Sequence, residues 1–191
     1  MKGIKFQREN KLLKAIILTV GIGIAMTNPY FGLYLSRGIA KEISKRLDSN
    51  KALDERAIRR GLYQLKRQKF IEYKILPNNK VKAELTKKGR KRFEIYNFED
   101  LKIKPSRNWD KKWRIVIFDI PEKKKGAREA LREKLKKLGF FRIQKSVWVY
   151  PYECKDEIDF VCEFFNVENY VLYFSAPLES DHSLRKYFKL I

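Results

Sequence analysis

The spacing of apolar residues changes twice along the chain, from the helical period of three or four to the strand period of two, and this change constrains the fold most. In the first half, residues 36–67 have helical spacing, and residues 70–85 alternate between apolar and polar side chains. In the second half, an apolar run at residues 113–118 precedes a helical stretch and an alternating stretch. Helices and strands that follow one another within each half predict an α+β protein, and a length of 191 residues allows two small domains.

Three helices are predicted at the start of the chain. The apolar residues from Ala15 to Met26 form the first helix, which we expect to be buried. The second helix begins after Ser36 and the third after Asp54, because both residues are good N-caps. The apolar faces of these two helices consist of Ile39, Ala40, Ile43 and Leu47, and of Ile58, Leu62 and Leu65.

A β-hairpin is predicted at residues 70–85, with its turn at Pro77, Asn78 and Asn79. Its inward side chains are Ile71, Tyr73, Ile75, Val81, Ala83 and Leu85. Thr86 then begins a short basic helix. Three helices followed by a basic hairpin are the order of a winged helix-turn-helix domain, which we place at residues 1–97.

The positive charge is concentrated in this half. The chain carries a net charge of +21, of which residues 1–104 carry +16 and residues 105–191 carry +5. Such an imbalance is typical of a domain that meets a polyanion, although an ordinary solvated basic surface is the alternative. In a winged helix, one helix enters the major groove of DNA and the hairpin meets phosphates. We therefore predict that double-stranded DNA is bound by Arg56, Arg59, Arg60, Tyr63, Lys66, Arg67, Lys74, Lys80 and Lys82.

The segment from Ala15 to Leu35 contains no charged residue, so a membrane anchor is a second interpretation of it. Asn28 and Pro29 interrupt the segment, and its continuous apolar part is about half of the ~20 residues that a spanning helix needs. We therefore expect a buried helix and no membrane attachment. The two cysteines, Cys154 and Cys162, are too sparse for a disulfide framework and fit a cytoplasmic protein.

A ferredoxin-like domain is predicted at residues 109–191, after a polar linker at residues 98–108. Its expected elements are a strand at 113–118, a helix at 125–138, two strands or one bent strand at 141–150, a helix at 156–165 and a strand at 170–176. Within the alternating stretch, Ile143, Val147 and Val149 form the apolar side. Trp148 and Tyr150 fall on the other side, among the polar residues.

Several motifs in this half fall in the order seen in one known family. They are Trp109 and Trp113, the run Phe118–Glu122, the run Leu138–Phe140 and the run Gln144–Val149. With them, residues 107–175 resemble the central domain of the PaaX family, which are repressors of phenylacetate-degradation operons. The family also has an N-terminal winged helix, and a further C-terminal domain that we expect this chain to lack. Its central domain is similar to the small ferredoxin-fold nuclease subunit of the CRISPR adaptation machinery.

The resemblance gives Asp119 two interpretations. In the nuclease subunit, an aspartate that closes the first strand and aligns with Asp119 is the proposed metal ligand. A nuclease or CRISPR-adaptation accessory that uses Mg²⁺ or Mn²⁺ would need Asp119 paired across a dimer, because one carboxylate supplies a single ligand. In the structural interpretation, which we favour, the carboxylate accepts backbone N–H bonds in the turn before Pro121. Glu122 lies in a lysine-rich loop, and His182 is expected at the surface.

Taken with the charge distribution, these observations favour a regulator over an enzyme. We predict a cytoplasmic homodimer that binds double-stranded DNA sequence-specifically and represses transcription, without a cofactor or catalytic metal. Two winged helices would read an inverted repeat, and the ferredoxin-like domains would hold them in register.

Overall fold

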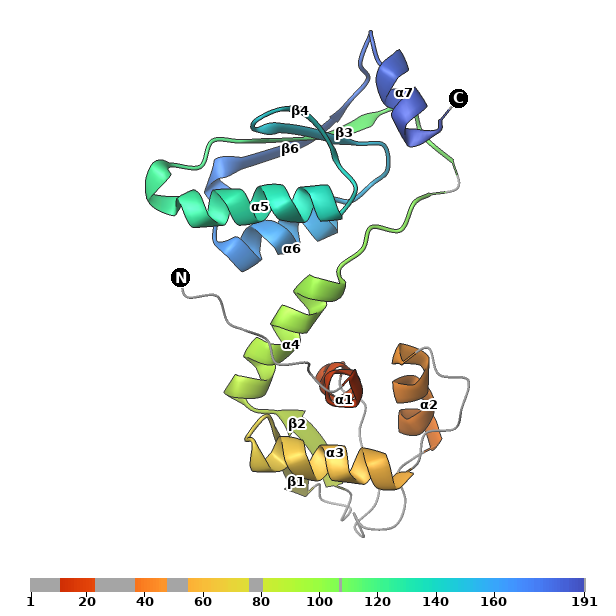
Figure 1. Ribbon diagram of the computed structural model, residues 1–191, viewed down its shortest axis with the longest axis vertical. Coiled ribbons are helices and arrows are strands. Elements are labelled where there is room, and N and C mark those ends of the chain that lie inside the picture. The colour runs from red at the N-terminus through yellow and green to blue at the C-terminus, as the bar shows by residue number, and fades with distance from the viewer. Residues whose placement is uncertain (1–10, 23–36, 48–54, 76–80, 107, 191) are drawn as a thin grey trace. The chain divides into compact units, whose positions relative to one another are not determined.

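The computed structural model describes residues 11–22, 37–47, 55–75, 81–106 and 108–190 (Figure 1). By its internal contacts the chain divides into two compact units, residues 1–99 and residues 100–191. Several predicted features lie outside the described residues, namely the caps Ser36 and Asp54, the hairpin turn at 77–79 and the wing residue Lys80.

The first unit contains four helices and a two-stranded antiparallel sheet among its described residues. They are α1 (Lys11–Gly21), α2 (Arg37–Arg46), α3 (Glu55–Arg67), β1 (Ile71–Ile75), β2 (Val81–Leu85) and α4 (Lys87–Asp100). Ile58, Leu62 and Leu65 of α3 are completely buried, as their spacing predicts. Ile71, Ala83 and Leu85 of the hairpin join the same core.

The apolar helix α1 forms the centre of this core. Its buried residues are Ala15, Ile16, Ile17, Leu18, Thr19 and Val20, which pack with residues of α2, α3 and β2. Apolar side chains that surround a helix on most sides are typical of one buried by its neighbours. Within the described parts of the chain, no helix has both the length and the apolar character needed to cross a bilayer.

Helix α4 is longer than predicted, because it continues to Asp100 and includes residues that the sequence assigned to the linker. It begins as expected at Thr86, whose Oγ1 accepts a hydrogen bond from the Gly89 amide at 3.1 Å. The amide of Thr86 donates to the carbonyl oxygen of Phe70 at 3.1 Å. This bond fixes the start of α4 against the segment that follows α3.

The second unit has the predicted order of strand, helix, two strands, helix and strand. The elements are β3 (Trp113–Phe118), the short 3₁₀ helix η1 (Glu122–Lys124), α5 (Lys125–Lys137), β4 (Phe141–Gln144), β5 (Val147–Tyr150), α6 (Lys155–Phe165), the 3₁₀ helix η2 (Glu168–Tyr170), β6 (Val171–Ala176) and α7 (His182–Phe188). The strands form one antiparallel sheet in the order β4-β5-β3-β6. This topology is that of a ferredoxin-like fold.

Helices cover both faces of this sheet, but to different extents. Figure 1 shows α5 and α6 side by side on one face. On the other face, Leu184 and Phe188 of α7 pack against Trp113, Ile115 and Val149. Because α7 has only seven residues, it shields one part of that face and leaves apolar residues of the edge strands exposed.

The predicted alternation of residues 141–150 was wrong in two respects. Trp148 and Tyr150, which were placed on the polar side, are buried, because β5 lies between β4 and β3 and both faces of the sheet are covered there. Ile143, which was placed on the apolar side, is 45% exposed. It lies on the edge strand β4, where the register with β5 shifts between Arg142 and Gln144.

Candidate nucleic-acid interface

Helix α3 separates its side chains into a buried face and a cationic face. On the face opposite the core, the exposed side chains are Arg56, Arg60, Tyr63, Lys66 and Arg67, and Arg59 is half-buried. Tyr63 is a large aromatic side chain with 69% exposure. The structure thus brings the six residues predicted on this helix to one surface.

A hollow of about 470 Å³ lies between this face and the hairpin, lined by Arg59, Tyr63, Lys66, Arg67 and Tyr73. The Nζ of Lys66 lies 4.9 Å from the centre of the Tyr73 ring, within the range of a cation–π contact. Burial raises the pKa of Tyr73 to about 12, so its hydroxyl stays neutral at physiological pH. Positive charge and aromatic surface therefore line the same concavity.

Tyr73 was predicted only as an inward residue of the hairpin. It does pack against the core of the first unit, and it also forms one wall of the hollow. The sequence holds no local signal for this second role, because the hollow arises where β1 meets α3.

A carboxylate engages two of the lysines predicted on the hairpin, Lys74 and Lys82. Glu84 on β2 forms ion pairs with Lys74 of β1 and with Lys82, whose Nζ lies 3.1 Å from Oε1. The pKa of Glu84 is lowered most by its hydrogen bond from Lys74 and next by that from Lys82. The bond to Glu84 in turn raises the pKa of Lys74. The described part of the hairpin therefore presents less positive charge than its lysines alone suggest.

The first turns of α4 add basic residues that lie close to the end of α3. The Nζ of Lys88 donates to the Gln68 carbonyl at 2.9 Å and lies 4.4 Å from the centre of the Phe70 ring. Lys87, Arg90 and Lys91 are exposed on the same helix. The sequence indicated a basic helix here, but its contact with the end of α3 depends on the bond between Thr86 and Phe70.

Asp119 lies directly after β3 and is exposed. Its backbone N–H donates to the Tyr170 carbonyl at 3.0 Å, but its carboxylate accepts no hydrogen bond from any residue that the structure describes. The favoured capping role is therefore not seen in this chain. The carboxylate of Glu122 is engaged by Arg128 at 2.7 Å, which is the main cause of its lowered pKa.

Metal ligands are not assembled around Asp119 within one chain. Across the described residues, no group of three or more His, Cys, Asp or Glu side chains is arranged to hold an ion. His182 is the exposed first residue of α7, in agreement with its expected surface position.

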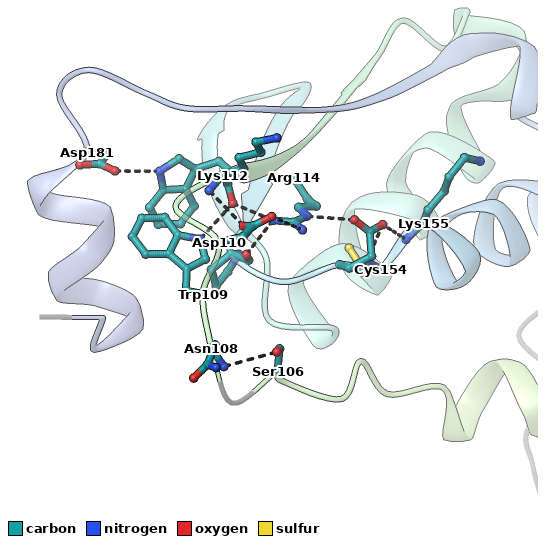
Figure 2. A network of polar contacts seen from close by, with 12 residues as sticks. Ser106, Asn108, Trp109, Asp110, Lys112, Arg114, Cys154, Lys155 and Asp181 are labelled. Atoms are coloured by element: carbon teal, nitrogen blue, oxygen red, sulfur yellow. Dashed lines mark hydrogen bonds and ion pairs between the residues drawn. The ribbon is translucent and has the colours of Figure 1, made fainter.

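A polar network gives several of the motif residues of the second unit a structural role (Figure 2). The indole N–H of Trp113 donates to Asp181 at 2.9 Å, and that of Trp109 donates to the Lys112 carbonyl at 2.9 Å. The two rings lie 5.0 Å apart. The tryptophan pair therefore anchors the start of β3 to α7.

Arg114 is the buried centre of the same network, although it interrupts an apolar strand. Its guanidinium makes two hydrogen bonds to Asp110, at 2.7 and 2.9 Å, and a third to Glu153 at 3.2 Å. The bond from Arg114 is the main cause of the lowered pKa of Asp110. The sequence did not reveal this role, because Glu153 lies 39 residues away from Arg114.

Glu153 extends the network to β6 and α6. Burial opposes its ionisation, but hydrogen bonds from Tyr173, from the Lys155 amide and from Arg114 outweigh this effect and lower its pKa. The adjacent Cys154 is buried, and burial raises the pKa of its thiol to about 12. A thiol with this pKa is protonated and unreactive at neutral pH, so the network is a structural tie and not a nucleophilic site.

Comparison with known proteins relates the second unit to one protein family. A search of curated proteins gives no match. Among solved structures, an uncharacterized protein, Rv0674 from Mycobacterium tuberculosis, is 15% identical, with a TM-score of 0.40 over 93% of this chain and 67% of that one. Residues 106–187 match the family model of the PaaX protein central Cas2-like domain. The second unit is therefore similar to the central Cas2-like domain of PaaX proteins.

Proposed function

We propose that the protein is a transcriptional regulator of the PaaX type, which binds double-stranded DNA sequence-specifically as a dimer and acts as a repressor. The observation that carries this proposal is the cationic face of α3, which lies opposite a completely buried face and beside the basic hollow. The match of residues 106–187 supports the choice of a regulator over other nucleic-acid-binding proteins.

In this proposal, α3 enters the major groove. Arginine donates two hydrogen bonds to the edge of guanine, and Arg56, Arg59 and Arg60 lie on the N-terminal half of the helix, where a recognition helix contacts bases. Lys66 and Arg67 lie toward its other end and would meet backbone phosphates beside the hollow. A dimer would place two such helices on an inverted repeat, and the spacing of the half-sites would be set by the dimer.

Affinity selection of genomic fragments, followed by gel-shift assays of the selected duplex, tests the proposal. Changing Arg59 and Arg60 together to alanine is expected to weaken binding at least about 30-fold, because each lost base contact costs about 1–3 kcal/mol. A control with Lys136 and Lys137 of the second unit changed to alanine removes the same charge and should bind like the unchanged protein. Equal effects of both pairs would reject α3 as the recognition helix.

A separate measurement tests the proposed dimer. Sedimentation of the unchanged chain, alone and with the selected duplex, is expected to show two protomers per inverted repeat. A single protomer on a complete operator would contradict the proposed arrangement.

A metal-dependent nuclease is the second candidate, and one observation favours it. The exposed carboxylate of Asp119, which no described residue engages, is available to an ion that a second copy would help to bind. Cleavage of DNA or RNA with Mg²⁺ or Mn²⁺ that is lost in Asp119→Ala would support this activity. Cleavage that is equal in the Asp119→Ala variant would exclude Asp119 from it.

A further inference from the structure

The edge strand β6 is unusually suited to accept another strand. It lies at the end of the sheet, and its six residues pair with β3 in an unbroken register from Val171 opposite Phe118 to Ala176 opposite Trp113. The sequence VLYFSA contains no charged residue and no proline. An edge strand of this kind presents unused backbone donors and acceptors without the features that normally discourage pairing.

The opposite edge of the sheet has those features. Strand β4 has four residues, and its register with β5 shifts between Arg142 and Gln144. Arg142 and the adjoining Lys145 are exposed cations. Short length, irregular register and charge all discourage strand addition, so β4 is a poorer site for an added strand than β6.

The two faces of β6 have different chemical character. Leu172 and Phe174 point away from the helical layer and are 60% and 37% exposed. On the other face, Val171 and Tyr173 line a groove of about 400 Å³ between β6 and α6. Tyr173 is held on that face by its hydrogen bond to Glu153 at 2.9 Å.

Carboxylates line this groove, in a chain whose net charge is +21. Asp159 and Glu163 come from α6, and Glu168 comes from η2. Asp159 has an ion pair with Lys155. Glu163 and Glu168 are exposed, and neither forms an ion pair with a residue that the structure describes.

We propose that β6 and this groove form a docking site for an extended segment of another protein in which apolar side chains alternate with lysine or arginine. A strand added beside β6 would direct alternate side chains to opposite faces of the sheet. One set would lie beside Leu172 and Phe174, where an apolar group is favoured. The other set would lie beside Glu163 and Glu168, where a cation is favoured.

A second copy of β6 fits this surface less well. Its six residues carry no charge that would complement the carboxylates. Pairing two β6 strands about a two-fold axis would also bring two acidic grooves together, and like charges repel. The site is therefore assigned to a different protein, and it is independent of the DNA-binding surface proposed for the first unit.

The test uses the full chain and a labelled synthetic peptide of eight residues in which valine and lysine alternate. Fluorescence anisotropy at low salt is expected to show binding of this peptide, and no binding of a peptide in which valine and glutamate alternate. Changing Glu163 and Glu168 together to lysine should weaken binding by about tenfold or more, since two attractions become repulsions. The control changes Glu94 and Glu133, two exposed carboxylates elsewhere, to lysine and has the same net charge.

Hydrogen exchange locates the bound peptide on the backbone. Amides of β6 are expected to exchange more slowly with the peptide present, whereas amides of β4 should not change. Equal loss of binding in both charge variants, or unchanged exchange in β6, would overturn the proposal.

The variant Leu172→Lys distinguishes the two alternative partners of β6, a segment of another protein and a second copy of this chain. It should weaken peptide binding and leave the oligomeric state of the chain unchanged. A change from dimer to monomer would show that β6 pairs with a second copy, and would overturn the assignment to another protein.

Discussion

Two glycines at helix starts are expected to respond with opposite sign to the same substitution. A Cβ added at Gly89 of α4 would lie 1.9 Å from the carbonyl oxygen of Phe70, whereas a Cβ at Gly126 of α5 would have no atom within 4 Å. Alanine is favoured over glycine within a helix, so Gly126→Ala gains about 0.5 kcal/mol. At Gly89 the backbone must move instead, because the obstructing atom is not a flexible side chain.

The cost at Gly89 has two parts. Overpacking of a buried site costs about 1–3 kcal/mol. Moving the Phe70 carbonyl also weakens the bond that it accepts from the Thr86 amide at 3.1 Å, which contributes about 1 kcal/mol. After subtraction of the gain in helix propensity, Gly89→Ala is expected to lower the free energy of unfolding of the first unit by about 2–3 kcal/mol.

Urea unfolding, followed by two spectroscopic signals, measures the effects of the two substitutions on stability. All three tryptophans, Trp109, Trp113 and Trp148, lie in the second unit, so their fluorescence reports on Gly126→Ala. Far-ultraviolet circular dichroism also includes the helices of the first unit. The midpoint for Gly89→Ala is expected to fall by about 1–2 M urea. An unchanged midpoint for Gly89→Ala, or a destabilised Gly126→Ala, would refute the packing argument.

Three further results are expected. Glu84→Gln should strengthen DNA binding and steepen its salt dependence, as measured by gel shifts at several KCl concentrations, because Lys74 and Lys82 become available to phosphates. The hydrogen bond from Arg114 lowers the pKa of Asp110 from its ordinary value of 3.8. The stability that this interaction contributes should therefore be complete above pH 3.8 and lost as the pH falls through the lowered pKa. Acid titration of Asp110→Asn should therefore show a smaller loss of stability. Cys154 and Cys162, whose pKa values burial raises to about 12, should resist alkylation at pH 8 until urea unfolds the second unit.

Amphipathic helices were the most predictable part of this fold. The spacing of Ile58, Leu62 and Leu65 identifies the buried face of α3 without reference to the rest of the chain, and the cationic face follows from it. Strand β5 could not be predicted in the same way. Trp148 and Tyr150 are buried because α5, α6 and α7 cover both faces of the sheet, and a strand covered on both faces has no period of two.

Whether an ion pair could be predicted from the sequence depends on how far apart its two residues lie in the chain. Lys82 and Glu84 are two residues apart on one strand, so they share a face and their pairing could have been expected. The ion pair between Arg114 and Glu153 joins strand β3 to the segment before α6, 39 residues away in the sequence, and only the folded topology brings them together. Buried charge in an apolar strand is the one local signal that such a partner exists.

The carboxylate of Glu84 bears on how the proposed regulator would select its operator. Lysines on a wing contact phosphates and attract any DNA sequence, so they raise specific and non-specific affinity alike. By engaging Lys74 and Lys82, Glu84 makes phosphates compete for them, and more of the binding free energy then depends on the α3 residues that face the bases. In Glu84→Gln, affinity for the operator and affinity for non-specific DNA should therefore rise by a similar factor. The ratio of the two, which determines occupancy of an operator among many competing sites, should stay the same, while the share of the binding free energy that depends on the α3 residues falls.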